Sequence, residues 1–200
     1  MSHLVRGKTF IVSGPSGVGK GTVLKELFKK RDMYYSVSAT TRDPREGEVD
    51  GVHYHFMSAD EFRTMIAEDA LLEHAEYAGN YYGTPARYVD EAMDSGRDVI
   101  LEIELQGARQ VCAKRPETIS VFIAPPSWEE LERRLITRGT DAPEKIAQRL
   151  QRAKIELESA GEYDYLVINE TVEEAAAELD AIMRAEHCRP ADRLDRVLGV

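Results

Sequence analysis

The residues from 13 to 22 constrain the fold of this chain more than any other feature. They read Ser-Gly-Pro-Ser-Gly-Val-Gly-Lys-Gly-Thr, follow a strand-like segment at 9–12 and precede a helical pattern that begins at Val23. A strand, a glycine-rich turn with a lysine and then a helix form the usual cradle for nucleotide phosphates. Glycines let the backbone N–H groups face phosphate oxygens, and the lysine and the helix N-terminus add positive charge. This run therefore predicts binding of a nucleoside triphosphate.

The residue after the lysine departs from the usual pattern. Ser or Thr normally follows the lysine, where its hydroxyl helps to hold Mg²⁺. Here Gly21 follows Lys20, and the hydroxyl comes one residue later, on Thr22. A magnesium ion would then depend more on water and on the phosphates. The plainer alternative, a glycine-rich turn with a solvated lysine, is disfavoured because the strand, the spacing and the helix agree.

Composition and charge exclude several kinds of function. The 200 residues are 42 % hydrophobic and 31 % charged, as in one globular domain, and the formal net charge is −10. Such a chain lacks the basic face that nonspecific binding to nucleic acid or to an anionic membrane requires. The sequence shows no apolar run of about 20 residues and no secretory signal, and Cys112 and Cys188 form no zinc-binding pattern. We expect a cytoplasmic protein with neither nucleic acid nor membrane as a partner.

Short apolar segments alternate with helical patterns, which predicts the α/β class with a parallel sheet covered by helices. We expect strands at residues 9–13, 98–103, 119–123 and 165–168. Helix-start signals are Thr84 with Pro85, Ser127 with Glu130, and Asp141 with Glu144, and a last helix is expected at 172–187.

Residues 37–83 interrupt this alternation and predict a small inserted α+β lobe. Strand patterns at 37–40, 52–56 and 71–77 surround one helix that Ser58 and Glu61 start, and Gly79-Asn80 suits a hairpin turn. Residues 127–159 carry many charges and few β-formers, which favours a helical lid. We expect a single domain over 1–200, with a core at about 4–36, 84–126 and 160–188 and a tail at 189–200.

The loop at residues 40–48 places Arg42 and Arg45 close together in an acidic chain. Arginine side chains match phosphate oxygens in bidentate geometry, so this loop fits a second phosphate site, separate from the glycine-rich turn. Taken alone, it fits a solvated loop with local ion pairs equally well.

Several blocks together make the chain resemble the guanylate kinases, which belong to the nucleoside monophosphate kinase superfamily. They occur in the family's order and span residues 9 to about 187. The Arg-x-x-Arg-x-x-Glu block followed by Asn-Tyr-Tyr-Gly is more specific than the glycine-rich turn. The blocks are residues 14–20, 36–42, 44–48, 79–84, 104–107, 122–127 and 138–140.

The resemblance implies a P-loop protein with a three-layer α/β/α core, a lobe that binds a nucleoside monophosphate and a lid. It implies Mg²⁺-dependent transfer of the γ-phosphoryl group of ATP to GMP, and to dGMP, in purine nucleotide metabolism. Whether the protein is a monomer or a homodimer stays open.

On the acceptor side, the resemblance implies that Arg42 and Arg45 clamp the GMP phosphate. Glu73 would accept the two adjacent donors of guanine, N1–H and the 2-amino group, which adenine does not offer together. Without the resemblance, Glu73 fits a solvent-facing residue on a strand. The full set of expected GMP-binding residues is Ser38, Arg42, Arg45, Glu48, Tyr54, Glu73, Tyr82, Thr84 and Glu104.

On the donor side, the resemblance implies that arginines of the lid cover the transferring phosphates. The expected ATP-binding residues are Gly14, Pro15, Ser16, Gly17, Val18, Gly19, Lys20, Gly21, Thr22, Arg134, Arg138 and Asn169. The expected catalytic residues are Lys20, Arg42, Arg138 and Arg149. Thr22 and Glu102 are expected near Mg²⁺, mainly through water.

Two other functions fit parts of the sequence. Related domains of scaffolding proteins bind other proteins without catalysis, but they typically lose the loop lysine or glycines, whereas this chain keeps Gly14, Gly19 and Lys20. A kinase of the same fold with another acceptor is the second alternative, against which Ser38, Glu73 and Thr84 argue.

Overall fold

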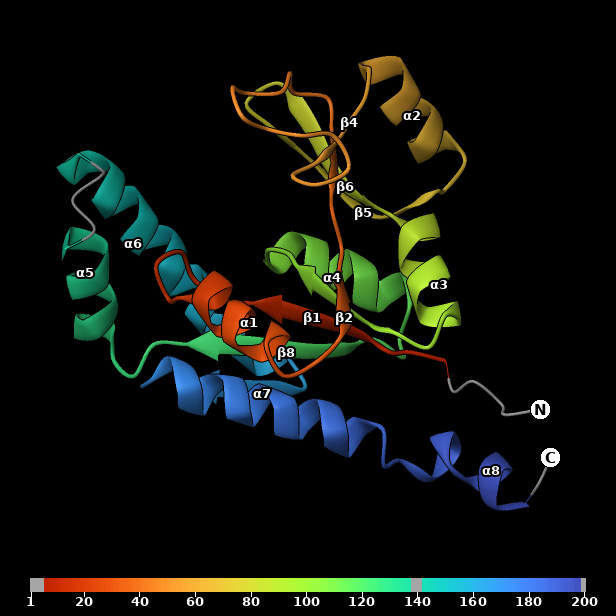
Figure 1. Cartoon of the computed structure of the whole chain (residues 1–200). Coiled ribbons are helices and arrows are strands. Elements are labelled where there is room, and N and C mark those ends of the chain that lie inside the picture. The colour runs from red at the N-terminus through yellow and green to blue at the C-terminus, as the bar shows by residue number, and fades with distance from the viewer. Residues whose placement is uncertain (1–5, 138–141, 199–200) are drawn as a thin grey trace. The chain divides into compact units, whose positions relative to one another are not determined.

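The computed structural model describes residues 6–137 and 142–198, which fold into an α/β protein (Figure 1). The chain forms two compact units. The first unit contains residues 12–32 and the described residues from 120 onward, and the second unit contains residues 6–11 and 33–119.

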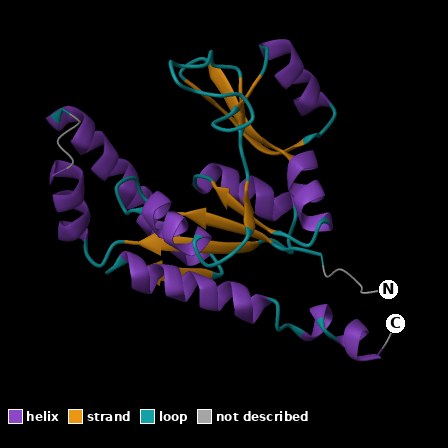
Figure 2. Cartoon of the chain, viewed as in Figure 1, coloured by secondary structure: helices purple, strands orange, loops and turns teal. Residues whose placement is uncertain are grey.

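The predicted parallel sheet is confirmed. Five strands form one sheet in the order β2-β7-β1-β8-β9, in which β2 runs parallel to β7 and β8 parallel to β9 (Figure 2). Every residue of β1 and β8 is buried, as expected for strands covered on both faces. The sequence did not predict β2, because three residues are too few to show a periodic pattern. The strands are β1 Thr9–Ser13, β2 Met33–Tyr35, β7 Asp98–Glu102, β8 Ile119–Ala124 and β9 Tyr165–Ile168.

The first unit contains two helix pairs. Helix α1 (Lys20–Phe28) packs against α7 (Val172–Glu186). Helix α5 (Trp128–Thr137) packs against α6 (Pro143–Glu158) around a small apolar core that includes Leu131. The unit also contains the short helices η1 (Ala160–Glu162), η2 (Pro190–Asp192) and α8 (Leu194–Leu198).

The second unit holds a smaller sheet in the order β4-β3-β6-β5. Helix α2 packs Phe62 against Ala39 and Leu71, and its capping box of Ser58 and Glu61 forms as predicted. The small strands β3 and β4 are shorter than the sequence predicted. These elements, with the two helices that flank β7, are β3 Ala39–Thr40, β4 His55–Phe56, α2 Ala59–Ala67, β5 Leu71–Tyr77, β6 Asn80–Pro85, α3 Ala86–Asp94 and α4 Leu105–Lys114.

The β5–β6 hairpin turns one residue earlier than predicted. Tyr77 pairs with Asn80, so the two turn residues are Ala78 and Gly79, with φ of 51° and 76°. A two-residue turn with positive φ at both positions matches the right-handed twist of its strands. Gly79 adopts this conformation without cost, and Ala78 pays a small one.

Two predicted helix starts are wrong in detail. Helix α3 begins after Pro85 without a side-chain cap, because Thr84 lies in β6 and its hydroxyl donates to Glu73. Helix α6 begins after Ala142, which has no capping side chain, and the expected cap Asp141 lies outside the described residues.

Only one of the two hydrogen bonds of the capping box predicted for α5 forms. The Glu130 N–H donates to Ser127 Oγ at 3.2 Å, as expected. The Glu130 carboxylate, however, accepts N–H groups from Arg133 and Arg134, each at 2.7 Å. Two nearby guanidinium groups bind a carboxylate more strongly than a single backbone N–H does, so the side chain points along the helix.

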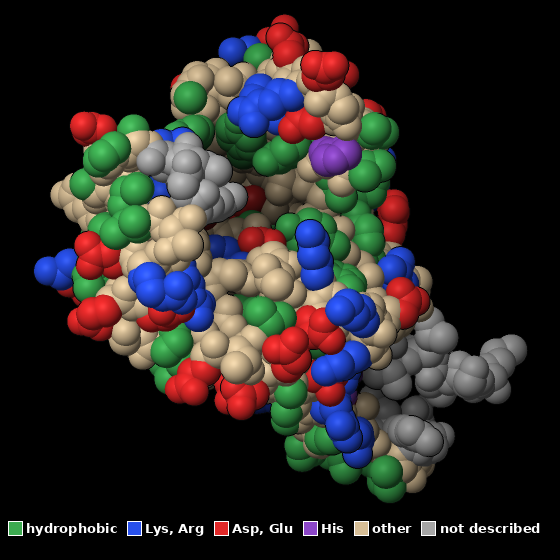
Figure 3. Space-filling view, turned by 60° about the vertical axis from the view of Figure 1, so that its left-hand side comes forward, with side chains coloured by type: hydrophobic (Ala, Val, Ile, Leu, Met, Phe, Trp, Pro, Cys, Tyr) green, Lys and Arg blue, Asp and Glu red, His purple; other side chains and the backbone are tan. Residues whose placement is uncertain are grey.

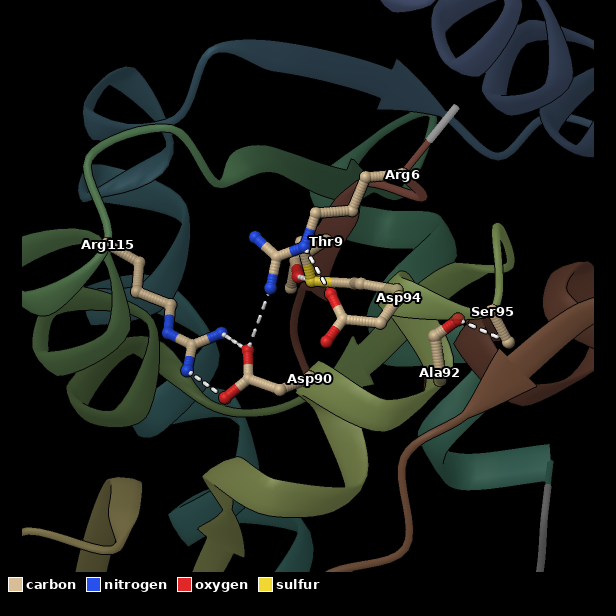
Figure 4. Close-up of polar contacts among 8 residues, drawn as sticks. Arg6, Thr9, Asp90, Ala92, Asp94, Ser95 and Arg115 are labelled. Atoms are coloured by element: carbon tan, nitrogen blue, oxygen red, sulfur yellow. Dashed lines mark hydrogen bonds and ion pairs between the residues drawn. The ribbon is translucent and has the colours of Figure 1, made fainter. Parts of the chain in front are cut away.

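An ion-pair network joins the first described residues to α3 and to the end of α4 (Figure 4). Asp90 accepts two N–H groups of Arg115, at 2.7 and 2.8 Å. Arg6 donates to Asp90 at 3.3 Å and to Asp94 at 2.7 Å. The hydrogen bonds from Arg115 hold the pKa of Asp90 below its usual range. The network therefore connects the middle and the C-terminal end of α3 to Arg6 and Arg115.

We expect Asp90→Asn to lower the free energy of unfolding by about 1 kcal/mol, because a bidentate ion pair that solvent partly screens is lost. This corresponds to roughly 2–4 °C in Tm for a chain of this length. The pKa of Asp90 is lowered in the folded state. Its contribution to the free energy of unfolding is therefore fully present above the ordinary pKa of aspartate and is lost as the pH falls through the lowered pKa. Thermal unfolding at pH about 7 and about 3 checks this, with the difference shrinking at the lower pH.

Asp60→Asn is the matched control, because Asp60 pairs with Arg63 while its side chain is 94 % exposed. It should leave Tm almost unchanged at both pH values. Equal effects of the two substitutions would contradict the assigned role of Asp90.

Candidate functional site

Three glycines of the loop before α1 are required by its backbone. Gly14, Gly17 and Gly19 have φ of 147°, 88° and 99°, a range that side chains rarely adopt. A Cβ on Gly14 would lie 2.2 Å from the carbonyl oxygen of Ile123 in β8. A Cβ on Gly17 would lie 2.7 Å from Leu135 in α5. The loop therefore lies directly on its neighbours and can do so only with glycine at these positions.

Lys20 opens α1 and turns back over the loop. Its ammonium donates to the carbonyl oxygen of Gly14 at 2.6 Å and to that of Pro15 at 3.4 Å. Gly21 and Thr22 are exposed, and a Cβ on Gly21 would meet nothing within 4 Å. Unlike the three loop glycines, Gly21 is therefore not required for steric reasons.

Arg134 and Asn169, two of the residues expected on the donor side, lie against the glycine-rich loop. Arg134 donates to the carbonyl oxygens of Val18 and Asn169, both at 3.1 Å. The Asn169 side-chain amide also donates to the Val18 carbonyl, at 2.7 Å. A third N–H of Arg134 binds Glu130 at 2.7 Å, and Arg133 with Arg134 lowers the pKa of Glu130 to about 2. The charged Glu130 therefore orients Arg134.

The other two arginines expected on the lid are Arg149 and Arg138. Arg149 in α6 donates to Ser16 Oγ of the loop at 3.1 Å. Arg138 lies outside the described residues. Within the first unit, the fold thus brings α5, α6 and the end of β9 to the same glycine-rich loop.

Arg42, in the second unit, is held by a carboxylate. Its guanidinium donates to the two oxygens of Glu48 at 2.8 and 2.9 Å, and Glu48 also accepts the Arg45 N–H at 2.7 Å. The hydrogen bonds from Arg42 and from the Arg45 backbone lower the pKa of Glu48 to about 2. Glu48 therefore stays charged and organises the arginine loop, while the Arg45 side chain is exposed.

Aromatic side chains surround the Arg42 guanidinium. Its central carbon lies 5.5 Å from the ring centre of Tyr54 and 5.8 Å from that of Phe56, both within the range of cation–π attraction. The Tyr54 and Tyr82 rings meet edge to face at 6.0 Å. These contacts bring together four residues that span 40 positions of the sequence, from Arg42 to Tyr82.

Glu73 is a buried carboxylate, not the solvent-facing residue that its local sequence suggests. It is 8 % exposed, and its Oε1 accepts the Thr84 hydroxyl at 2.7 Å. Burial raises the pKa of Glu73, and the charge of Glu104 adds to the effect, while the Thr84 hydroxyl opposes it. The Thr84 hydroxyl has a single proton and donates it to Glu73 in this structure, so Thr84 orients the Glu73 carboxylate. Ser38, the other expected base contact, is half-buried beside β3.

Glu102 is the last residue of β7, and Glu104, two residues later, directly precedes α4. Glu102 Oε2 accepts the hydroxyl of Tyr35 at 3.0 Å, and Glu104 is the N-cap residue of α4. Burial and the neighbouring Glu102 raise the pKa of Tyr35, so its proton stays in place. Over the described residues, no cluster of three or more His, Cys, Asp or Glu side chains could hold a metal by itself.

Thr22 in the first unit offers an exposed hydroxyl, and Glu102 in the second unit offers a carboxylate. Oxygens of these two kinds are the ligands that Mg²⁺ prefers.

Sequence reasoning missed residues that act on the expected site through other residues. The spacing of Glu130 and Arg134, four apart on a helix, could have indicated their pairing. Tyr35 and Gln110 gave no signal, because their partners are distant in sequence. Gly107 lies in the block 104–107, but the sequence gave no signal of its closeness to Glu73.

The surface agrees with the composition. On the face shown in Figure 3, acidic and basic side chains are interspersed. In the part of the chain that the structure describes, every helix is too short or too polar to cross a membrane.

Comparison with known proteins gives consistent matches. The family model described as guanylate kinase matches residues 6–186. A guanylate kinase of Streptococcus agalactiae is 54 % identical over 196 residues, which cover 97 % of this chain and 92 % of that protein. One of Clostridium perfringens is 51 % identical over 190 residues, covering 94 % and 88 %. The crystal structure of guanylate kinase from Anaplasma phagocytophilum has a TM-score of 0.70 at 34 % identity, covering 92 % of this chain and 88 % of that one.

These matches extend over both units and include the glycine-rich loop, the arginine loop and the buried carboxylate in one continuous stretch. Because the family model spans most of the chain, and relatives above half identity cover nearly all of it, the chain belongs to the guanylate kinase family.

Proposed function

We propose that this protein transfers the γ-phosphoryl group of ATP to GMP in the presence of Mg²⁺ and forms ADP and GDP. Its membership in the guanylate kinase family supports the reaction. The observation that carries the choice of acceptor is the buried Glu73 carboxylate, oriented by Thr84. The protein-binding alternative is not favoured, because Gly14, Gly19 and Lys20 are all present.

Recognition of guanine follows from the hydrogen bonds that Glu73 can make. Guanine presents N1–H and a 2-amino group side by side, and one carboxylate can accept both. Adenine has no hydrogen on N1, so a buried carboxylate facing it would stay partly unsatisfied, at a cost of about 1–3 kcal/mol. Ser38 and Thr84 would donate to O6 of guanine, for which Thr84 must turn from Glu73.

The acceptor phosphate would bind the arginine loop. Arg42 is already held by Glu48, with Tyr54 and Tyr82 beside it. Guanidinium groups match phosphate oxygens, so Arg42, oriented by Glu48, would bind the phosphate, and Arg45, which is exposed, would complete the clamp. Glu104, at the start of α4, is proposed on the same side because its charge acts on Glu73.

The donor phosphates would bind the glycine-rich loop and the start of α1. Lys20 would leave its carbonyl partners and reach the outer phosphates, while Arg149 and Arg138 would neutralise charge that develops on the transferring group. Arg134 and Asn169, which already contact the loop, would border the nucleotide. A general base is not needed, since the second pKa of a phosphate is about 6 and the acceptor is largely ionised.

Thr22 and Glu102 would hold Mg²⁺, mainly through water. The ion, when bound, neutralises charge on the donor phosphates. We further propose that residues 37–83 and 127–159 act as a lobe and a lid that close over the substrates, because exclusion of water prevents hydrolysis of ATP. A cytoplasmic location and the use of dGMP complete the proposal.

The experiment that tests this function measures ADP release from ATP and Mg²⁺ with GMP, AMP, CMP or UMP as the acceptor. We expect rapid release with GMP alone. Release with a different acceptor would keep the kinase reaction but overturn the roles of Glu73, Ser38 and Thr84. No release with any acceptor, from protein shown to be folded, would overturn the proposed reaction.

Lys20→Ala should lower kcat by about 100-fold or more while the protein stays folded, because a cation that acts on the transferring phosphates is removed. Steady-state kinetics and thermal unfolding check both parts. Lys25→Ala is the matched control, since Lys25 is an exposed lysine of the same helix, and it should leave kcat unchanged. Near-normal turnover of Lys20→Ala would refute the role of Lys20.

As the pH is lowered, GMP affinity should begin to fall at a higher pH than it would with a glutamate of ordinary pKa. The pKa of Glu73 is raised, so its carboxylate takes up a proton sooner and loses the ability to accept both guanine donors. Calorimetric titration with GMP between pH about 8 and about 5 measures this. Glu73→Gln is the control, because the GMP phosphate still titrates but residue 73 no longer does. If GMP affinity depended on pH in the same way in the wild type and in this variant, the prediction would be contradicted.

A further inference from the structure

One face of α4 contacts the strand that carries Glu73. Gly107, Gln110 and Lys114 are spaced three and four apart, so they share a side of the helix. Lys114 donates to the Leu71 carbonyl oxygen at 2.8 Å. Gln110 makes two hydrogen bonds to the next part of β5: its Oε1 accepts the His74 N–H at 3.1 Å, and its Nε2 donates to the His74 carbonyl at 3.0 Å.

The pair of bonds from Gln110 replaces a missing strand. β5 is at the edge of the smaller sheet, and its register against β6 shifts between Leu71 and His74. An irregular edge leaves backbone groups without ladder partners. The Gln110 amide satisfies both groups of His74, as a neighbouring strand would. Glu73 lies inside this irregular stretch, so its backbone position depends on how the edge is held.

Gly107 sets the space for the Glu73 side chain. It is buried in the first turn of α4 and has an ordinary helical backbone, so glycine is not needed for its conformation. A Cβ at this position would lie 3.0 Å from Glu73 Oε2 and 3.3 Å from both Cδ and Cγ. The carboxyl group thus occupies the volume that any other residue would fill.

We propose that α4 determines base selectivity by positioning Glu73, with Gln110 as a positioning residue and Gly107 as a specificity-determining residue. Gln110 fixes the backbone of the irregular β5 edge, and Gly107 allows the carboxylate to lie against the helix. Both are needed for Glu73 to face two adjacent donors at once. The inference rests on the proposed function, in which Glu73 accepts N1–H and the 2-amino group of guanine.

Gly107→Ala separates selectivity from stability. Alanine favours a helix over glycine, so the melting temperature should stay the same or rise. The new methyl group should displace the Glu73 carboxylate by a few tenths of an ångström and weaken its contact with the 2-amino group. We expect the ratio of kcat/KM for GMP to kcat/KM for inosine monophosphate, which lacks that group, to fall about fivefold or more. The KM for ATP should not change.

Gln110→Met tests the second residue. It keeps the length and helix preference of glutamine but removes both hydrogen bonds to His74. The same ratio should fall by a similar factor. Arg109→Met is the matched control, because Arg109 is the exposed neighbour in the same helix, and it should keep the wild-type ratio.

A third variant distinguishes failure of the inference from failure of the proposed function. If Glu73→Gln lowers the GMP-to-inosine-monophosphate ratio while Gly107→Ala and Gln110→Met keep it, the role of Glu73 stands and the inference about α4 is overturned. If Glu73→Gln also keeps the ratio, the base is read elsewhere and both fall. A fall in all three variants, with a stable Gly107→Ala protein, supports the inference.

Discussion

The close approach of the glycine-rich loop to β8 is the constraint on which the first unit depends. The Gly14 Cα lies so near the Ile123 carbonyl that no side chain fits between them, and Gly19 is similarly close to the Asn169 side chain. This contact places the start of α1 directly beyond the end of β1, where the helix dipole and the loop N–H groups can act on an anion. It also brings the loop within reach of Arg134 and Arg149.

Carboxylates orient the arginines in both units. Glu48 holds Arg42, and Glu130 holds Arg134, each with a pKa lowered to about 2, so both stay charged at any physiological pH. A guanidinium that already has one anionic partner loses less conformational entropy when a phosphate arrives.

Glu73 shows the opposite use of a carboxylate. It is buried, its pKa is raised, and its hydrogen-bond partner is a neutral hydroxyl. A ligand that offers two hydrogen-bond donors satisfies such a buried carboxylate and binds favourably. A ligand that offers none leaves the carboxylate unsatisfied, which weakens binding. In the second unit, therefore, the proposed function divides selectivity and charge neutralisation between two residues, Glu73 for the first and Arg42 for the second.

The sequence by itself determined the glycine-rich loop, the parallel sheet and the alternation of strands and helices, because these depend on local patterns of glycine and apolar residues. The residues on each side of the reaction were expected from the resemblance to the guanylate kinases and stay a prediction. The tertiary structure alone decided that Thr84 binds Glu73 instead of capping α3, that Gln110 completes the edge of β5, and that Gly107 makes room for a carboxylate. These contacts join residues 11 to 36 positions apart, and no local pattern records them. Burial of Glu73 likewise follows from packing, since a single glutamate in a strand pattern fits either face.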